Sequence, residues 1–284
     1  MKHNAYIITG PTASGKSSFA HNLAREIGGT IINADSVQIY RGIENISASP
    51  FATREITPDI DGVPYRLFSV LPLAEQISVV DYLKMARAEY DAAIASGKTP
   101  IFVGGTGYYI NALINGVSPM PDIDDDVRNK ARKMVDDDID AVRKMLPPEF
   151  VATDPQRVAR ALEVFLQTGT HITEFQKNAR VGAIVPNAYR ILINPPAEIL
   201  RERIAARIPE MMSGGAIDEA RAVIDAGWDE SRAIGAAQLC QYLRGEITME
   251  DAIENWITKT NQYAKRQRTW FRTQYKPDEI ITKV

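Results

Sequence analysis

Three features of the sequence predict an α/β protein in which a parallel sheet with flanking helices carries an inserted all-helical subdomain. Short apolar runs alternate with longer stretches of helical periodicity, as in βαβ units. The first apolar run leads into Gly10–Ser17, which fits the phosphate-binding pattern G-x-x-x-x-G-K-[ST] between a strand and a helix. Strand signals are missing from the middle of the chain. We therefore expect a P-loop NTPase-like fold, with the first part of the core at 1–116, a helical insertion at 117–185, and core completion with basic C-terminal helices at 186–284.

Length and composition restrict the classes of function. The 284 residues, 45% of them hydrophobic, can form one large core, and the net charge of −3 argues against a surface that coats nucleic acid everywhere. Cys240 is the single cysteine, which excludes a disulfide within the chain and a thiolate metal cage. No apolar run approaches the ~20 residues of a membrane span. Because a strand is predicted from Ala5, we expect no signal peptide and a cytoplasmic protein.

The phosphate-binding pattern implies a specific chemistry. Glycines at positions 10 and 15 let the loop wrap around a phosphate chain, and the start of the next helix directs free backbone N–H groups at it. Lys16 adds a positive charge and Ser17 can bind Mg²⁺. A glycine-rich turn that only caps a helix would not need these two residues at fixed offsets. The loop is therefore expected to hold an anion with two or more phosphates.

The next elements place a carboxylate beside this loop. A helix should run from about 16 to 27 and end at Gly28, and a second strand should follow at 30–33. Asp35 comes directly after that strand, at the edge where open α/β sheets bind ligands. A carboxylate beside a polyphosphate needs a role such as metal binding or proton transfer. The alternative is that Asp35 caps a helix.

A second glycine-rich turn follows later in the core. Residues 99–103 are predicted to form a buried strand, which leads into Gly104–Gly107 with the hydroxyl of Thr106. Many nucleotide hydrolases have a Mg²⁺-binding Asp at the end of such a strand, so the glycines argue against an ATPase. The elements expected between the two glycine-rich turns are an irregular loop at 40–61, a strand at 65–70 and a helix at 78–96.

The insertion is predicted to be helical over 127–146 and 155–167. Asp154 should cap the second helix, which places Arg157 and Arg160 on one face, where they could meet phosphates or simply water. One acidic cluster lacks the Gly and Glu spacing of a calcium loop, so a solvated helix face is favoured. This cluster consists of Asp136, Asp137, Asp138 and Asp140.

The core is expected to resume with a strand at 189–193 and a helix at about 198–212 that carries Arg201, Arg203 and Arg207. Such arginines could close over a polyphosphate, as lid helices do in P-loop transferases. Alternatively, they pair with glutamates at the surface. We expect at least one of the three to be functional.

The C-terminal stretch 259–272 has five basic side chains, no acidic one, and interleaved aromatic residues. Basic groups neutralise RNA phosphates, and aromatic rings stack on unpaired bases. Alternatively, Trp270 and Phe271 pack into the core, and both interpretations can hold together.

These motifs together resemble the bacterial tRNA dimethylallyltransferase family across nearly the whole chain. The segments that carry the resemblance are GPTASGKS at 10–17, NADSVQIY at 33–40, VGGTGYY at 103–109, Gln156-Arg157 with Leu162-Glu163, and AKRQRTWF at 264–271. The resemblance implies transfer of a dimethylallyl group from dimethylallyl diphosphate to N6 of adenosine 37, in tRNAs that read codons beginning with U. It further implies Mg²⁺ as cofactor, the anticodon stem-loop as partner, and the isoprenoid diphosphate rather than ATP in the loop. We expect a monomer.

The resemblance also implies roles for individual residues. Asp35 would be the base that takes the proton from N6, while Thr106 and Arg207 would stabilise the departing diphosphate as further catalytic residues. Ser17 would be the metal ligand. The diphosphate-binding residues implied are Gly10, Thr12, Ala13, Ser14, Gly15, Lys16 and Ser17. The tRNA-binding residues implied are Asp35, Ser36, Val37, Gln38, Thr106, Arg128, Gln156, Arg157, Arg160, Arg232, Lys265, Arg266 and Arg268.

The chain departs from the family pattern outside the diphosphate site, and its insertion is short. It has Gly235-Ala-Ala-Gln238 where the family usually has Gly-Tyr-Arg-Gln, and Ser47-Ala-Ser-Pro50 where Thr-Ala-Lys-Pro is usual. Tyr65-Arg66 stands where paired histidines are usual. These changes bear on RNA affinity or substrate range. Two alternatives stay open: a small-molecule P-loop kinase with ATP in the loop, and an RNA-binding homologue with weakened activity.

Overall fold

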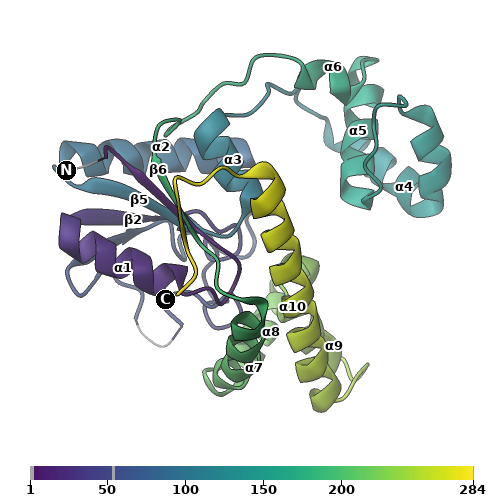
Figure 1. Ribbon diagram of the computed structural model, residues 1–284. Coiled ribbons are helices and arrows are strands. Elements are labelled where there is room, and N and C mark those ends of the chain that lie inside the picture. The colour runs from purple at the N-terminus through teal and green to yellow at the C-terminus, as the bar shows by residue number, and fades with distance from the viewer. Residues whose placement is uncertain (1–2, 53–54, 284) are drawn as a thin grey trace. The chain divides into compact units, whose positions relative to one another are not determined.

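The computed structural model describes residues 3–52 and 55–283 (Figure 1). The chain divides into a core unit, Met1–Ile114 with Ile184–Val284, and an inserted unit, Asn115–Ala183. The predicted fold class is confirmed, because the core unit is built on a mainly parallel sheet with flanking helices and the inserted unit is mainly helical.

The sheet of the core unit has the strand order β3-β4-β2-β5-β1-β6-β7. All neighbouring strands are parallel except β3 and β4, which are antiparallel. Crossovers of helix or long loop separate the parallel strands along the chain, as parallel pairing requires. The strands are β1 (Tyr6–Thr9), β2 (Gly29–Asn33), β3 (Asp59–Ile60), β4 (Val63–Arg66), β5 (Thr99–Gly104), β6 (Tyr189–Ile193) and β7 (Glu279–Ile281).

The central strands are buried on both faces. Every residue of β1, β2 and β5 is buried, which is why these strands are continuous apolar runs in the sequence rather than alternating ones. In register, Val103 of β5 lies beside Ile8 of β1 on one side and beside Asn33, the last residue of β2, on the other. The strands β1, β2 and β5 therefore end together at one edge, and the loops that follow them meet there.

Helices cover the two sides of this sheet (Figure 1). Helix α1 packs with Phe19, Leu23 and Ile27 against the strand core, while α2 packs against β2 and β5 and buries Tyr82 completely. The helices of the core unit are α1 (Lys16–Ile27), α2 (Val79–Ala95), α3 (Gly107–Asn115), α7 (Ala197–Ser213), α8 (Ala216–Asp225), the short 3₁₀ turn η1 (Glu230–Arg232), α9 (Ala236–Leu243) and α10 (Met249–Gln274).

Local signals explain where several helices begin and end. Gly28 terminates α1 in a left-handed conformation, as the sequence predicted. The Ser78 side chain accepts a hydrogen bond from the Asp81 N–H and caps α2. Thr248 and Asp251 form a reciprocal capping box at the start of α10.

Three expectations for the core need correction. The strand predicted at 65–70 is β4 and ends at Arg66, because Leu67 and Ser69 adopt positive φ angles that a strand cannot contain. The region 40–61 consists mainly of turns as expected, but its end forms β3; residues 53–54 of this loop lie outside the described residues. Strand β7 was not predicted, since only the parallel partner β6 makes this short and exposed segment a strand.

The inserted unit contains α4 (Asp125–Met145), α5 (Pro155–Thr168) and α6 (Ile172–Gln176). The first two pack against each other around Val135, Val158 and Leu162. Asp154 caps α5 by accepting from the Arg157 N–H, which confirms that prediction. Helix α6 was not predicted, and α4 has non-helical backbone angles at Asp138. The four aspartates of the predicted solvated face are all exposed.

Helices α7 to α10 form a group beside the sheet (Figure 1). Helix α10 packs against both α7 and α9, and α9 also packs against α8. Within the described residues, no helix combines the length and apolar character needed to cross a membrane.

Candidate functional site

The phosphate-binding loop connects β1 to α1 at the edge where the central strands end. Lys16 Nζ lies 3.4 Å from the Pro11 carbonyl oxygen, so the lysine side chain folds back over its own loop. The Ser14 hydroxyl is buried and has no hydrogen-bond partner among the described residues. Ser17, at the start of α1, is exposed. The loop thus presents a lysine and a buried hydroxyl without a protein acceptor, as expected of a site that binds an anion.

Two of the three arginines of α7 reach this loop. Arg203 Nη1 donates to the Ser14 carbonyl oxygen at 3.2 Å, and Arg207 Nη2 donates to the Thr12 hydroxyl at 2.9 Å. Residues four apart lie on one helix face, whereas Arg201 points elsewhere and pairs with Glu198 at 2.9 Å. Arg201 thus forms the surface pair of the second interpretation, whereas the polyphosphate role expected of Arg203 and Arg207 stays a prediction that their contacts with the loop support.

The electrostatics of the loop favour a negatively charged ligand. The pKa of Lys16 is lowered to about 8, mainly by burial; the neighbouring Asp35 opposes this shift and Arg207 adds to it. Burial also lowers the pKa of Arg207, whose Nε has no hydrogen-bond partner among the described residues. Two cations held close together in a partly desolvated site gain free energy from a polyphosphate.

Asp35 lies at the same edge of the sheet. Its Oδ1 accepts the Val37 N–H at 3.0 Å and the Gln38 N–H at 3.4 Å within a turn. No helix begins there, so the helix-cap alternative is not what the structure shows. The Ser36 N–H donates to Thr106 Oγ1 at 3.0 Å, which links this turn to the second glycine-rich turn. Asp35 is also near enough to Lys16 to affect its pKa. The structure therefore brings together three separate loops, which contain Lys16, Asp35 and Thr106.

Tyrosines that were not assigned a role lie near enough to Asp35 for its charge to affect their pKa values. Tyr109 stacks on Tyr82 with ring centroids 3.8 Å apart, and its pKa is raised by burial and then by the nearby Tyr40 and Asp35. Burial and Asp35 likewise raise the pKa of Tyr263. Tyr109 stands in the quoted VGGTGYY segment, which was the available signal, whereas nothing near Tyr263 in the sequence shows that it faces Asp35.

Arg232 and Gln38 also belong to this neighbourhood. Arg232 lies close enough to lower the pKa of Tyr109, and it pairs with Asp229 at 3.5 Å. Gln38 Nε2 donates to the carbonyl oxygens of Ser47 and Ala48, so it holds the following loop.

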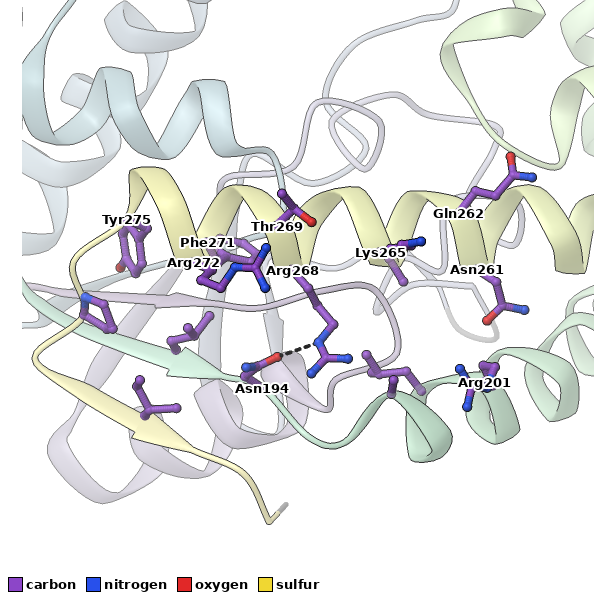
Figure 2. Close-up of a pocket in the computed structure, with 16 residues that line it drawn as sticks. Asn194, Arg201, Asn261, Gln262, Lys265, Arg268, Thr269, Phe271, Arg272 and Tyr275 are labelled. Carbon is purple, nitrogen blue, oxygen red and sulfur yellow. Dashed lines mark hydrogen bonds between the residues drawn. The ribbon is translucent and has the colours of Figure 1, made fainter.

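The basic residues of α10 do not share one face. Lys265 and Arg268 line a groove of about 830 Å³ between α10, α7 and the ends of β6 and β7 (Figure 2). Arg268 Nε donates to Asn194 Oδ1 at 3.2 Å within it. Arg201 and Arg272 also line this groove. Arg266 lies elsewhere, with its guanidinium 5.8 Å from the centre of the Tyr263 ring.

The aromatic residues of α10 support the structural alternative. Phe271 is buried, and the Trp270 ring lies edge-on to Phe271 and packs so closely on Gly107 that a Cβ there would stand 2.7 Å from the indole. Both rings therefore have packing roles within the core unit, while Lys265, Arg266 and Arg272 of the same motif are exposed.

The remaining predicted RNA-contacting residues belong to the inserted unit. Arg128 pairs with Asp125 at 2.8 Å, and Arg160 pairs with Glu163 at 3.1 Å. Gln156 and Arg157 are exposed on the first turn of α5.

The donors near the loop fit a magnesium ion that arrives with phosphates. The described residues contain no cluster of three His, Cys, Asp or Glu side chains suited to a metal. The exposed hydroxyl of Ser17 would be the protein ligand, and phosphate oxygens with water would complete the octahedron, as Mg²⁺ commonly accepts.

Fold and site together define an α/β protein with a P-loop-like fold, in which a loop of the phosphate-binding pattern lies beside a carboxylate. The model of the IPP transferase family matches residues 38–274, and that of isopentenyl transferases matches residues 3–57. The chain belongs to the IPP transferase family. A tRNA dimethylallyltransferase of Gluconacetobacter diazotrophicus is 38% identical over 277 residues, which covers 93% of this chain and 82% of the relative. A tRNA dimethylallyltransferase of Rhizobium etli is 37% identical over 286 residues, which covers 95% of this chain and 94% of the relative.

Solved structures show the same fold. The tRNA isopentenylpyrophosphate transferase of Bacillus halodurans aligns with a TM-score of 0.69 at 31% identity, over all of this chain and 91% of that one. A eukaryotic dimethylallyltransferase, described as acting on tRNA, aligns with a TM-score of 0.70 at 25% identity. The alignment covers 94% of this chain and 69% of that one.

Proposed function

We propose that this protein transfers a dimethylallyl group from dimethylallyl diphosphate to N6 of adenosine 37 in tRNAs that read codons beginning with U. The observation that carries the proposal is the meeting of Asp35 with the cationic phosphate-binding loop at one edge of the sheet. A base beside a polyphosphate site suits a reaction in which a nucleophile loses a proton while a diphosphate leaves. The relatives named as tRNA dimethylallyltransferases supply the substrate class.

Asp35 acts as the general base in this proposal. The amino group of adenine is a weak nucleophile because its lone pair is delocalised into the ring, so removal of its proton must accompany bond formation. Two backbone N–H groups fix Oδ1 of Asp35, while Oδ2 accepts no hydrogen bond among the described residues. Oδ2 is therefore the oxygen assigned to the N6 proton. Burial raises the pKa of the Tyr109 and Tyr263 phenols above the ordinary value, so neither competes with Asp35 as the base.

The opposite side of the site stabilises the leaving group. As the bond between the allylic carbon and oxygen breaks, negative charge gathers on the diphosphate, where fixed cations and N–H groups are most effective. Lys16, Arg207 and the loop N–H groups are assigned to this charge, with the Thr106 hydroxyl as a further donor. Mg²⁺ held through Ser17 would neutralise the diphosphate further.

The RNA is bound by cations on both units in this proposal. Arg232 and Arg266 lie on the Asp35 side of the core unit, so they are assigned to the anticodon loop near the reacting adenine. Arg128, Gln156, Arg157 and Arg160 of the inserted unit and Lys265 and Arg268 of the groove are assigned to phosphates of the stem-loop. The target adenine must leave its stack to reach Asp35. We further propose that the enzyme acts as a monomer in the cytoplasm.

The test is an assay with Mg²⁺, dimethylallyl diphosphate and unmodified tRNA containing A36-A37-A38, with N6-prenyladenosine measured by nucleoside mass spectrometry. Asp35→Asn keeps the size of the side chain and an acceptor for the turn, and it should lower kcat by ~10²–10⁴-fold. Asp91→Asn, at an exposed position of α2, is the matched control. Product formation by Asp35→Asn at the wild-type rate would remove the base role. ATP turnover without prenylation would indicate the kinase alternative instead.

A further inference from the structure

We infer that Gln267 of α10 is a positioning residue that holds the phosphate-binding loop and the second glycine-rich turn in register. The inference rests on the proposed function, because that proposal assigns the leaving-group site to one of these loops and Thr106 to the other. The glutamine lies between basic residues in the sequence, yet it is buried with 6% of its surface exposed, unlike Lys265 and Arg266.

Both ends of the Gln267 amide are used. Its Oε1 accepts the Thr12 N–H at 2.8 Å, and its Nε2 donates to the Gly105 carbonyl oxygen at 2.9 Å. The two partners come from different loops, after β1 and β5, and only this orientation of the amide places its acceptor at the Thr12 N–H and its donor at the Gly105 carbonyl oxygen. One planar group therefore sets the separation of the two loops.

The contact is close enough to dictate a neighbouring residue. A Cβ at position 105 would stand 2.5 Å from Nε2 of Gln267, so the amide of Gln267 would have to shift to admit one. Glycine at this position is thus explained by the approach of α10 rather than by the turn alone.

The two hydrogen bonds extend into the reacting groups on either side. The Thr12 hydroxyl accepts from Arg207, so Gln267 and Arg207 fix the same residue from α10 and α7. On the other side, Thr106 follows Gly105 directly and accepts the Ser36 N–H beside Asp35. The amide therefore connects the diphosphate end of the site to the end that carries the base.

Other roles for Gln267 do not fit this geometry. An RNA contact requires an exposed side chain, and Gln267 is buried. A contact with the phosphates is also disfavoured, because Oε1 is an acceptor that would repel them and Nε2 is already bonded to Gly105.

The test compares Gln267→Glu with Gln274→Glu, the latter at an exposed position on the last turn of the same helix. The buried carboxylate of Gln267→Glu cannot donate to the Gly105 carbonyl and repels it. The first readout is the affinity for inorganic pyrophosphate with Mg²⁺, measured by calorimetry without RNA between pH 5.5 and 8. The second is kcat for prenyl transfer at saturating substrates.

Gln267→Glu should bind pyrophosphate about tenfold more weakly than wild type at pH 8 and have a lower kcat, because a buried hydrogen bond is lost. Burial and the facing carbonyl raise the pKa of the introduced carboxyl. It regains a proton as the pH falls and can then donate to Gly105, so the ratio of mutant to wild-type affinity should rise towards one at low pH. The ratio for Gln274→Glu should stay constant.

Several outcomes would overturn the inference. One is a Gln267→Glu variant whose pyrophosphate affinity and kcat equal those of wild type. Another is a loss of pyrophosphate affinity that does not change with pH and is accounted for by a lower unfolding temperature of the variant. If wild-type protein binds pyrophosphate but forms no prenyladenosine, the proposed function fails, while the pyrophosphate readout still decides the role of Gln267. If wild-type protein does not bind pyrophosphate, both the proposed function and the inferred role of Gln267 fail.

Discussion

The guanidinium of Arg207 donates a hydrogen bond to the Thr12 hydroxyl over 2.9 Å, although 195 residues separate the two in the chain. The contact joins α7 to the phosphate-binding loop. Because the Nε of Arg207 is buried without a partner among the described residues, a bound polyphosphate would gain a donor that is already desolvated.

The substitution Arg207→Lys tests this contact. Lysine keeps the positive charge but lacks the rigid, planar set of donors, so it bonds Thr12 and a phosphate oxygen together less favourably. We expect the Kd for pyrophosphate to rise about tenfold, consistent with the ~1.5–3 kcal/mol typical of a hydrogen bond to a charged group, and kcat for prenyl transfer to fall. Calorimetry and steady-state kinetics measure these changes. Arg221→Lys, exposed on α8, is the control, and equal affinities for all three proteins would contradict the prediction.

The lowered pKa of Lys16 predicts a pH dependence of anion binding. The ammonium is protonated below a pKa of about 8 in the free protein, and a bound diphosphate favours the protonated form. Affinity for pyrophosphate should therefore be constant below about pH 7 and fall as the pH rises through 8, up to ~10-fold per pH unit. Lys16→Met should bind weakly and without this decline, and a wild-type profile that stays flat to pH 9.5 would contradict the assignment.

Glu219 of α8 should stabilise the loop that follows Asp35. Its Oε1 accepts the Asn45 N–H at 2.7 Å, and its Oε2 accepts the Ile46 N–H at 2.8 Å. Glu219→Gln places an amide NH₂ against one of these donors, which should lower the free energy of unfolding by ~1–3 kcal/mol. Urea denaturation measures the change, and Glu254→Gln, exposed on α10, should be neutral. An unchanged midpoint for Glu219→Gln would show that the loop is held by its other contacts.

The exposed Arg157 of the inserted unit should contribute one phosphate contact to RNA binding. Arg157→Ala should weaken tRNA binding at low salt and reduce the slope of log K against log salt by ~1. Filter binding at several salt concentrations measures both quantities. Lys84→Ala removes the same charge from an exposed position of α2 and should leave the slope unchanged. Identical slopes for both variants would remove Arg157 from the interface.

Much of the fold was predictable because its signals are local. The phosphate-binding pattern, the glycine after Ile27 and the serine before Val79 each determine a turn or cap within a few residues. The missed elements lack such signals: β7 depends on pairing with β6, and β4 ends early because Leu67 and Ser69 take positive φ angles. A short exposed strand cannot be distinguished from a loop without its partner.

The candidate site was predictable in its residue types but not in its connections. Glycines, Lys16 and Asp35 stand in motifs whose chemistry follows from their spacing. In contrast, helix spacing alone could not decide which arginines of α7 face the loop, nor that Lys265 and Arg266 lie in different surroundings.

The sequence by itself determined the phosphate-binding loop, the parallel α/β core, the helical insertion and the resemblance that the family match later confirmed. Only the tertiary structure decided that Gln267 bonds two loops and that Arg203 and Arg207 reach the phosphate-binding loop while Arg201 does not. It also decided that Tyr109 lies near Asp35. The physical reason is that backbone conformation responds to near neighbours in the chain. A hydrogen bond between residues far apart in sequence exists only once packing has fixed both partners.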